Sequence, residues 1–566
     1  MKTKAVIEYG ATDLTAKTDS TLSSTNIQSF STANNIKTDP EEIKYSTLEK
    51  NYFILDGSFT NMPANVSNVG YWSLSRTGNN KSFTTPITLT ITFTENHSSV
   101  GLTLSFSEYS YCTHLKISYY NSSNTLLTEE DFYPDSPEYF CEDEAVNYRK
   151  IIITFYSTNE AHRYIKLYKI LYGRTIVFEG DNLISADIVE ELDPLSNELS
   201  INTLDFVCFA TDDRFNILNP QGAYLTFQKT QPLKAYRVEN GTTTDMGTFY
   251  LDSWENESQK SMKMQGIDLI GILDKSEFNG GIYEEKDAED LIEDIFATAN
   301  ITNYTIQDIT GETLTGYLPI CTCREALQQV LFSLGAVADC SRSATINIYK
   351  LAPAPTPPEI ESDVVLQDTK EIKQGEIVTG VQVTTHSYKL KRETETLYEE
   401  NLAQGTYRVV FGVPSANLTI TGGTITESGV NYAVINVTGS SSSSTKYHGN
   451  KTVTIEGNTY DDLTNTLTVT DGETHDITNV LMVDNCTFIN GTNAQTIATR
   501  ILNHYLGSYN SKFGMILGSE KTGDNVITEK STTNYLDGYV TKLDIDLTGG
   551  FLANAEIISK VGEISG

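Results

Sequence analysis

The stretch "TCREALQQVLFSLGA", residues 322–336, carries the start, stop and periodicity signals of a short helix. Thr322 and Glu325 have the spacing of a capping box, in which each side chain accepts a hydrogen bond from the other residue's backbone N–H. Gly335 stands where a glycine commonly ends a helix. Between these ends the apolar residues recur at helical spacing, namely Leu327, Val330, Leu331 and Leu334. We therefore predict a scaffold helix.

Three cysteines flank this helix and raise the alternative of a thiol or metal site. Cys321 and Cys323 form a CxC pair, with Cys340 further along, whereas zinc sites use CxxC pairs or nearby histidines to complete a tetrahedral set. The chain has seven scattered cysteines, and this odd number does not indicate a disulfide framework in so large a protein. We expect free thiols that pack in the core, and no metal or other cofactor.

Length and charge limit the function classes. A chain of 566 residues is expected to form roughly three to five domains. Its 40 basic and 74 acidic side chains give a net charge of −34, which argues against a surface that binds phosphate backbones. The N-terminus lacks the apolar segment of a signal peptide, and no run of about 18 apolar residues predicts a membrane span. We expect synthesis in a cytoplasm.

Hydrophobic periodicity predicts a mainly β fold with a small α+β part. Period-two runs such as Ile87, Leu89 and Ile91, separated by turn signals such as "ENHSSVG" (95–101), are typical of an antiparallel β-sandwich. We expect residues 1–44 and 174–275 to form one β-barrel, with residues 45–173 as a sandwich inserted into it. Residues 276–351 are expected to form a helix-hairpin unit. A stiff proline-rich connector, residues 352–362, then separates this unit from a second β-barrel with one amphipathic helix, residues 363–566.

Two more helices are predicted outside the opening stretch. Asp287 is a candidate N-cap for a helix with an apolar stripe at Ala288, Leu291, Ile292, Ile295, Phe296 and Ala299. The segment 493–507 carries a similar stripe at Ile497, Ala498, Ile501, Leu502 and Tyr505. His504 in this helix is expected at its boundary or surface.

Catalytic signatures are weak. The seven histidines (His97, His114, His162, His386, His448, His475 and His504) are dispersed, without HExxH spacing or an obvious triad partner. The acidic segment "TEEDFYPDSPEYFCEDE" (128–144) offers the paired carboxylates of a wall hydrolase, but a solvated loop between strands is the favoured interpretation. Phosphate-binding glycine loops are absent from the sequence. We expect no enzyme activity.

The candidate carbohydrate-binding residues are Tyr71, Trp72 and Arg76 in "GYWSLSR". An aromatic face can stack on a sugar ring while a nearby guanidinium supplies hydrogen bonds. The alternative is core packing for Trp72 and a solvated Arg76, because early strands of such sandwiches commonly bury an aromatic residue.

Several segments resemble known families. "YSTLEKNYFILDGSF" (45–59), "GYWSLS" (70–75) and "RYIKLYKILYG" (163–173) look like a galactose-binding-like, discoidin-type jelly roll. The chain that follows is similar to the first barrel and the helix-hairpin unit of phage tail hub proteins, on the segments "SNELSINTLDFVCF" (196–209), "DDRFNILNPQG" (212–222), "MGTFYLDSWE" (246–255), "MQGIDLIGILD" (264–274) and "CREALQQVLFSLGAVADCSRSATINIYK" (323–350).

The resemblance implies a structural hub of a phage or phage-derived tail, located in the virion at the baseplate or tail tip. It implies a homotrimer whose two barrels per subunit form a six-fold-like ring below the tail tube. The implied partners are the tail tube or distal tail protein, the tape measure protein and other baseplate or spike proteins. DNA is expected to pass through the lumen without specific binding, since an acidic wall repels phosphates.

Other features of the family leave alternatives open. Many related tail proteins carry a wall hydrolase after the hub, but "KVGEISG" (560–566) ends this chain soon after the second barrel, so we expect any lytic enzyme on another chain. The family does not dictate whether the jelly roll contacts a host cell-wall glycan, or whether the tail is contractile. The alternative function is a soluble glycan-binding adhesin without a hub role.

Overall fold

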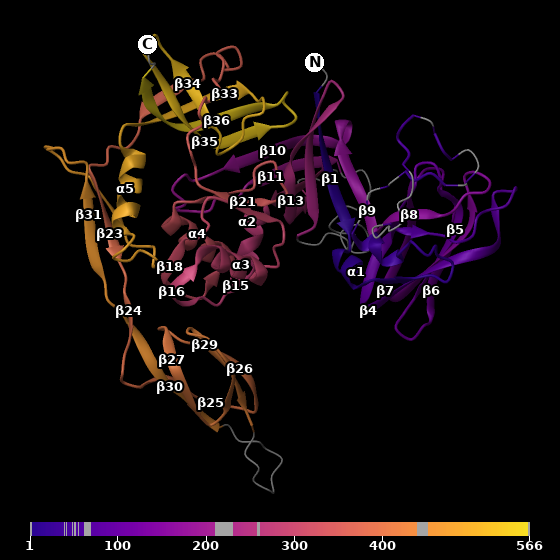
Figure 1. The fold of residues 1–566 in the computed structure, drawn as a ribbon, viewed down its shortest axis with the longest axis horizontal. Coiled ribbons are helices and arrows are strands. Elements are labelled where there is room, and N and C mark those ends of the chain that lie inside the picture. Colours follow the sequence, from indigo (N-terminus) through magenta and orange to yellow (C-terminus); the bar gives the residue numbers. More distant parts are fainter. Residues whose placement is uncertain are drawn as a thin grey trace, which may run out of the picture. The chain divides into compact units, whose positions relative to one another are not determined.

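The computed structural model describes residues 3–38, 40, 42, 44–47, 49, 52–54, 56–60, 69–209, 230–256, 261–438 and 451–563. The chain divides into two compact units: unit 1 comprises residues 1–7, 179–209 and 232–566, and unit 2 comprises residues 8–178 and 210–231. Strands predominate in both units, which confirms the mainly β prediction (Figure 1). In the described part of the chain, every helix is too short or too polar to cross a membrane. The segment 212–222 lies outside the described residues.

One large sheet in unit 1 joins strands from distant parts of the chain. Its order is β22-β33-β36-β35-β10-β11-β14-β13-β12, and β34 also pairs with β35. β10 pairs antiparallel with β11 on one side and with β35 on the other, from Asp187 opposite Asp546 to Glu191 opposite Lys542. The strands are β10 (Leu183–Glu191), β11 (Thr203–Phe209), β12 (Pro232–Glu239), β13 (Thr242–Asn256), β14 (Ser261–Ile267), β22 (Glu371–Gln374), β33 (Ser508–Ile516), β34 (Asn525–Lys530), β35 (Asn534–Asp546) and β36 (Leu552–Glu563).

A small α+β part packs into the main core of unit 1. Its buried apolar residues come from α3 and α4, from the short strands around them and from α5. The elements are α2 (Leu269–Ile272), β15 (Glu277–Phe278), β16 (Gly281–Asp287), α3 (Ala288–Thr298), β17 (Tyr304–Ile306), β18 (Thr313–Leu318), β19 (Cys321–Thr322), α4 (Cys323–Leu334), β20 (Val337–Asp339) and β21 (Ile346–Tyr349).

The signals of the opening stretch are confirmed in α4. Thr322 Oγ1 accepts a hydrogen bond from the Glu325 backbone N–H at 3.2 Å, and Glu325 Oε2 accepts from the Thr322 backbone N–H at 2.9 Å. Gly335 has φ of 70°, a left-handed conformation that glycine adopts without strain. The predicted N-cap Asp287 of α3 is also confirmed, because its carboxylate accepts from the Glu289 and Asp290 backbone N–H groups.

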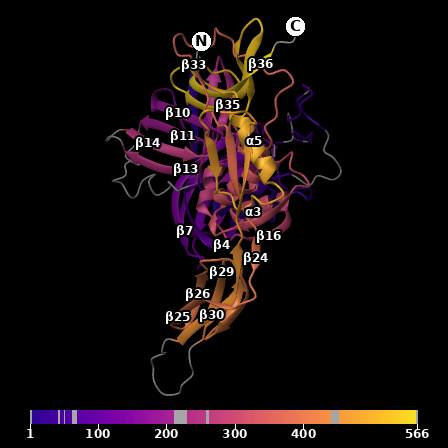
Figure 2. The ribbon, with the colours of Figure 1, turned by 90° about the vertical axis from the view of Figure 1, so that its left-hand side faces the viewer.

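The rest of unit 1 consists of small sheets and one helix. α5 (Ala494–Tyr505) lies against β23 and β31, as Figures 1 and 2 show, and buries the predicted stripe from Ile497 to Leu502. The strands of residues 395–462 enclose a separate apolar core around Val409, Ile435 and Ile455. The strands are β23 (Gly380–Thr385), β24 (Tyr388–Leu390), β25 (Glu395–Leu402), β26 (Gly405–Val410), β27 (Ser415–Thr421), β28 (Thr424–Ser428), β29 (Tyr432–Val437), β30 (Lys451–Asp462), β31 (Asn465–Thr470) and β32 (Val480–Val483).

The proline-rich connector does not stand free. The Ile360 backbone N–H donates to the Ile527 carbonyl, and the Ile527 backbone N–H donates to the Pro358 carbonyl, each at 2.9 Å. The connector is thus hydrogen-bonded along β34, contrary to the prediction that it only separates its neighbours. Proline has no backbone N–H to donate, but its carbonyl can still accept a hydrogen bond, as that of Pro358 does here.

Unit 2 is built on a bent antiparallel sheet with the order β3-β8-β4-β7-β5-β6, and β2 pairs with β4. The predicted period-two runs are confirmed as buried positions of β4, β5 and β7. The elements are α1 (Leu14–Asp19), β2 (Thr21–Ser23), β3 (Tyr71–Trp72), β4 (Ser82–Phe106), β5 (Cys112–Tyr120), β6 (Leu126–Phe132), β7 (Glu138–Thr158) and β8 (Lys166–Leu171); β1 (Thr3–Thr12) and β9 (Gly173–Glu179) carry the chain between the units.

The turn predicted at 95–101 is instead part of β4. The segment stays extended, but its pairing with β7 shifts register at several points between Thr92 and Gly101. Asp19 supplies hydrogen-bond acceptors there, since its Oδ2 accepts from the Thr94 and Glu95 backbone N–H groups at 2.9 Å. A side chain distant in sequence therefore stabilises a bulged strand where local polarity indicated a turn.

A buried polar junction connects three parts of unit 1; we define it as Glu190, Asn202, Asp268, Ser341, Arg342 and Thr522. Arg342 lies in the β20–β21 turn with φ of 52°, and its Nε donates to Glu190 Oε1 on β10 at 3.0 Å. The guanidinium also donates to the Glu520 carbonyl. The neighbouring Ser341 hydroxyl bonds to that of Thr522. The helix-hairpin part is thereby tied to segments before and after it in the chain.

Asp268 completes the junction as the N-cap of α2. Its carboxylate accepts from the Gly271 and Asn202 backbone N–H groups, both at 3.0 Å, and its side chain is buried. Burial raises the pKa of Asp268 to about 7, although the two backbone hydrogen bonds favour the ionised form.

This raised pKa predicts a pH-dependent stability. The folded state retains a proton that the unfolded state releases near pH 3.8, so the contribution of Asp268 to the free energy of unfolding falls as pH rises from there to about 7, and is constant above. Asp268→Asn has no such titration. We expect the stability difference between the unsubstituted protein and this variant to shrink over that range, measured by urea denaturation. Parallel pH profiles of the two proteins would contradict the assignment.

Candidate functional site

The predicted carbohydrate-binding residues Tyr71 and Trp72 form β3 in the core of unit 2. They pair with β8, and their exposed fractions are 0% and 1%. Tyr71 stacks on Phe155 with ring centroids 6.2 Å apart. Phe30 packs edge-on against Trp72 at 5.5 Å, and the indole N–H donates to the Tyr168 hydroxyl at 3.2 Å. Neither ring presents a face to solvent.

A buried ammonium group takes up one face of Trp72. Lys166 Nζ lies 4.5 Å from the Trp72 ring centroid and 3.3 Å from that of Tyr52. It donates to Glu49 Oε2 at 2.5 Å, and both charged side chains have 0% exposure. Burial lowers the pKa of Lys166 to about 8, while Glu49 acts in the opposite direction. This cation–π and ionic cluster stabilises the interior of unit 2.

Arg76 is exposed and lies apart from the two buried rings. It lines a cleft of about 590 Å³. Its guanidinium lies 5.9 Å from the Tyr164 ring centroid. The other polar residues of this cleft include Asn26, Ser75, Thr84, Thr88 and His162. The structure therefore does not bring the three predicted residues to one site. The burial of Trp72 agrees with the alternative of core packing, and sugar binding by the trio stays a prediction.

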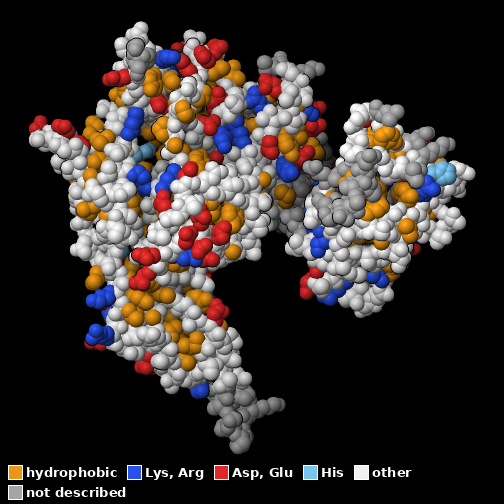
Figure 3. Space-filling view, viewed as in Figure 1, with side chains coloured by type: hydrophobic (Ala, Val, Ile, Leu, Met, Phe, Trp, Pro, Cys, Tyr) orange, Lys and Arg blue, Asp and Glu red, His pale blue; other side chains and the backbone are white. Residues whose placement is uncertain are grey.

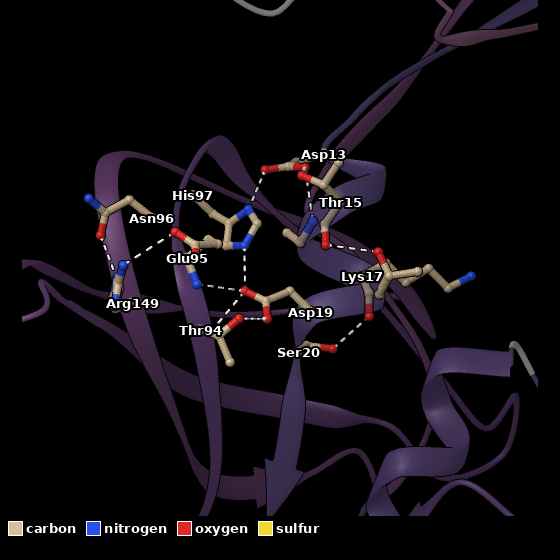
Figure 4. Close-up of polar contacts among 12 residues, drawn as sticks. Asp13, Thr15, Lys17, Asp19, Ser20, Thr94, Glu95, Asn96, His97 and Arg149 are labelled. Atoms are coloured by element: carbon tan, nitrogen blue, oxygen red, sulfur yellow. Dashed lines mark hydrogen bonds and ion pairs between the residues drawn. The ribbon is translucent and has the colours of Figure 1, made fainter. Parts of the chain in front are cut away.

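His97 has two carboxylate partners that sequence reasoning missed. Its Nδ1 lies 2.9 Å from Asp13 Oδ2 and its Nε2 lies 2.9 Å from Asp19 Oδ2 (Figure 4). Both ring nitrogens thus have a carboxylate partner within hydrogen-bond distance. The partners lie 84 and 78 residues away in the sequence, so no local spacing could have indicated them.

The His97 cluster connects α1 to the bulged part of β4. Asp13 is the N-cap of α1 and accepts from the Ala16 backbone N–H at 2.9 Å. Burial raises the pKa of Asp19, but hydrogen bonds from Thr94, from the Glu95 backbone and from His97 outweigh it and hold this pKa well below its usual range. Because both ring nitrogens are occupied, His97 has no free nitrogen for general base catalysis. The cluster is a structural clamp.

Most of the remaining histidines in the described part of the chain also have polar partners. His114, His386 and His475 each lie within 2.9 Å of an aspartate oxygen, and His162 bonds to the Asn79 side chain. His504 is partly exposed, and burial lowers its pKa. His448 lies outside the described residues.

The acidic segment 128–144 is mostly strand and not the predicted loop. Residues up to Phe132 belong to β6 and residues from Glu138 belong to β7. Lys116 Nζ lies 3.4 Å from Glu129 Oε1 and 3.6 Å from Asp131 Oδ2. Salt bridges along the sheet surface thus keep these carboxylates in a strand, which the charge run alone did not indicate.

The cysteines are free thiols, as predicted. Burial raises the pKa of Cys321 to about 12 and that of Cys323 to about 11, so neither is a thiolate at neutral pH. Within the described ranges, no group of three or more His, Cys, Asp or Glu side chains is arranged to hold a metal ion.

Comparisons with known proteins find similar solved structures. The chain is similar to a 43 kDa prophage tail protein from Shewanella oneidensis, with 10% identity and a TM-score of 0.40 over 68% of this chain and 95% of the other. It is also similar to a tail protein from Neisseria meningitidis, with 11% identity and a TM-score of 0.41 over 67% and 93% of the two chains. A prophage tail protein from Listeria monocytogenes has 10% identity and a TM-score of 0.36 over 68% and 91%.

No protein-family model matches the chain, and neither does any curated protein sequence.

Removal of His97 tests the clamp. His97→Gln removes the ring that bridges two largely buried carboxylates, so we expect unit 2 to lose about 1–3 kcal/mol of unfolding free energy. The chain has two tryptophans, so a Trp254→Phe background leaves Trp72 as a fluorescence reporter of unit 2 in urea denaturation.

The matched control is His114→Gln. His114 pairs with Asp131 at the surface, where the two side chains are 31% and 40% exposed, and its loss is expected to cost less than about 1 kcal/mol. Adding Asp13→Asn to His97→Gln removes one unpaired charge and keeps a capping side chain, so it is expected to restore part of the stability. Equal losses at His97 and His114 would contradict the clamp.

Proposed function

We propose that this protein is the structural hub of a phage or phage-derived tail, located in the virion at the baseplate or tail tip. It acts as a homotrimer that surrounds a channel below the tail tube. Its partners are the tail tube or distal tail protein, the tape measure protein and other baseplate or spike proteins. It works through assembly and not through catalysis.

The observation that supports this proposal most directly is the pairing of β10 with β35. It joins a first β module, strands β10–β14, to a second β module, strands β33–β36, within one continuous sheet. Three subunits arranged around a three-fold axis would contribute six neighbouring modules, which suits contact with a six-fold tail tube. The polar junction and the α+β part hold the two modules of one subunit in a fixed relation.

The charge of the chain suits a channel for DNA. Each subunit carries a net charge of −34, which repels phosphates and lets a nucleic acid pass without binding. Exposed carboxylates gather on unit 1 where α3 and β16 reach the surface, including those of Glu284, Glu285, Asp290, Glu293 and Asp294 (Figure 3).

The described residues also suit a structural role. Both ring nitrogens of His97 are occupied by carboxylates, so this histidine is not available as a general base. Burial raises the pKa values of Cys321 and Cys323, so neither is a thiolate at neutral pH. The alternative role, a soluble adhesin that binds glycans through unit 2, now depends on Arg76, because the other two predicted residues are buried.

Solution mass tests the trimer. We expect light scattering of the purified chain to give three times its mass of 62.7 kDa, with three-fold rings in negative stain. Because like-charged subunits repel one another, the trimer fraction is expected to rise with salt concentration. A monomer that persists at high protein concentration and high salt would contradict the proposal.

A further inference from the structure

A cleft of about 650 Å³ in unit 1 has no role in the proposed hub function. Its volume lies in the range of small-molecule sites, roughly 300–1,000 Å³. Its walls come from β16, β18, β24, β30 and the segment before α5. The lining residues that matter here are Tyr283, Glu284, Glu285, His386, Tyr388 and Tyr460.

His386 contributes an unsatisfied polar atom to this cleft. Its side chain is 9% exposed, and its Nδ1 lies 2.8 Å from Asp462 Oδ2. The carboxylate only accepts, so Nδ1 donates to it. Nε2 is fully buried and has no hydrogen-bond partner among the described residues. In either protonation state this nitrogen lacks the partner that a buried polar atom usually has. Because it has almost no accessible surface, a hydroxyl in the cleft reaches it only if the side chains that cover it move.

Tyrosine rings line the same cleft. Tyr388 stacks parallel to His386, with ring centroids 6.2 Å apart and an interplanar angle of 6°. Tyr283 and Tyr460 line it from other strands, and all three tyrosines are only partly buried. An aromatic face beside fixed polar groups suits a ligand with an apolar ring face and polar edges.

A bulge forms the acidic rim of the cleft. The pairing of β16 with β18 shifts register between Tyr283 and Lys286, and Glu285 within it has φ of 48°. Bulges commonly re-aim side chains beside binding sites, and a left-handed glutamate is strained. The lining residues include Glu284 and Glu285 but neither lysine nor arginine, which disfavours phosphates and acidic sugars.

The walls of the cleft are fixed to one another. Asn490 Nδ2 donates to the Thr315 carbonyl at 3.0 Å, which ties the segment before α5 to β18. The His386 backbone N–H donates to the Ile489 carbonyl at 2.8 Å. A preformed site loses little conformational entropy when a ligand binds.

We propose that this cleft is a binding site for a neutral carbohydrate. The rings of Tyr283 and Tyr388 pack against the apolar face of the sugar, and Glu284 accepts a hydrogen bond from one of its hydroxyls. The site is separate from Arg76 in unit 2, and its existence does not depend on the hub role.

Calorimetric titration of the full chain tests this site with four probes: lactose, maltose, chitobiose and glucuronic acid. We expect at least one neutral disaccharide to bind and glucuronic acid not to bind. Tyr388→Ala is expected to weaken that binding about tenfold, the size of one lost stacking contact. Glu284→Ala, an exposed rim change that leaves the fold intact, is expected to weaken it as well.

Two matched controls locate the site. Tyr133→Ala removes an exposed tyrosine that stacks on His114 in unit 2, with ring centroids 4.7 Å apart, and is expected to leave binding unchanged. Arg76→Ala is also expected to leave it unchanged. The inference is overturned if none of the neutral disaccharides binds, or if binding survives Glu284→Ala and Tyr388→Ala but is lost in Arg76→Ala. Either result leaves the solution mass, and hence the hub proposal, unaffected.

Discussion

The guanidinium of Arg342 connects segments of unit 1 that are far apart in the sequence. It donates to Glu190, 152 residues earlier, and to the Glu520 carbonyl, 178 residues later. Arg342 and Glu190 are 11% and 1% exposed. A buried ion pair gains stability only when its geometry and surrounding hydrogen bonds offset the cost of desolvation, and removal of either partner leaves an unpaired buried charge. The relation between the two β modules therefore depends on this small polar junction as well as on the strand pairing beside it.

The two clusters stabilised by charge have different consequences. The His97 clamp fixes a short helix to a bulged strand inside unit 2, and neither of its ring nitrogens is free for chemistry. His386 is also held by an aspartate, but its second nitrogen is left without a partner in a cleft lined by tyrosines. The two histidines thus differ in whether the second ring nitrogen has a partner.

The parts of the fold that sequence predicted are those with local signals. The capping box at Thr322, the N-cap at Asp287 and the apolar stripe of α5 depend on residues three to four positions apart, and all three helices form. The mainly β fold followed from period-two runs for the same reason. Whether a strand continues or turns was harder to predict, because at 95–101 the deciding hydrogen bonds come from Asp19.

The candidate site depended on contacts that sequence does not reveal. Trp72 was a reasonable aromatic for stacking on a sugar, but Lys166 and Tyr168 cover it from another strand. The acidic segment 128–144 contributes to two strands, β6 paired with β5 and β7 paired with β4, and Glu129 and Asp131 on β6 lie beside Lys116 and His114 of β5. The cleft around His386 combines residues from five separate segments, so no motif in the sequence could have indicated it.

A three-dimensional reconstruction of the assembled protein by electron cryomicroscopy would show how the β modules are arranged around the proposed channel. We predict three copies around an open axis, with the first and second β modules of each subunit alternating to give six modules around the channel and with acidic side chains on the channel wall. An assembly without a three-fold axis, a closed axis, or a ring in which the two modules do not alternate would contradict it.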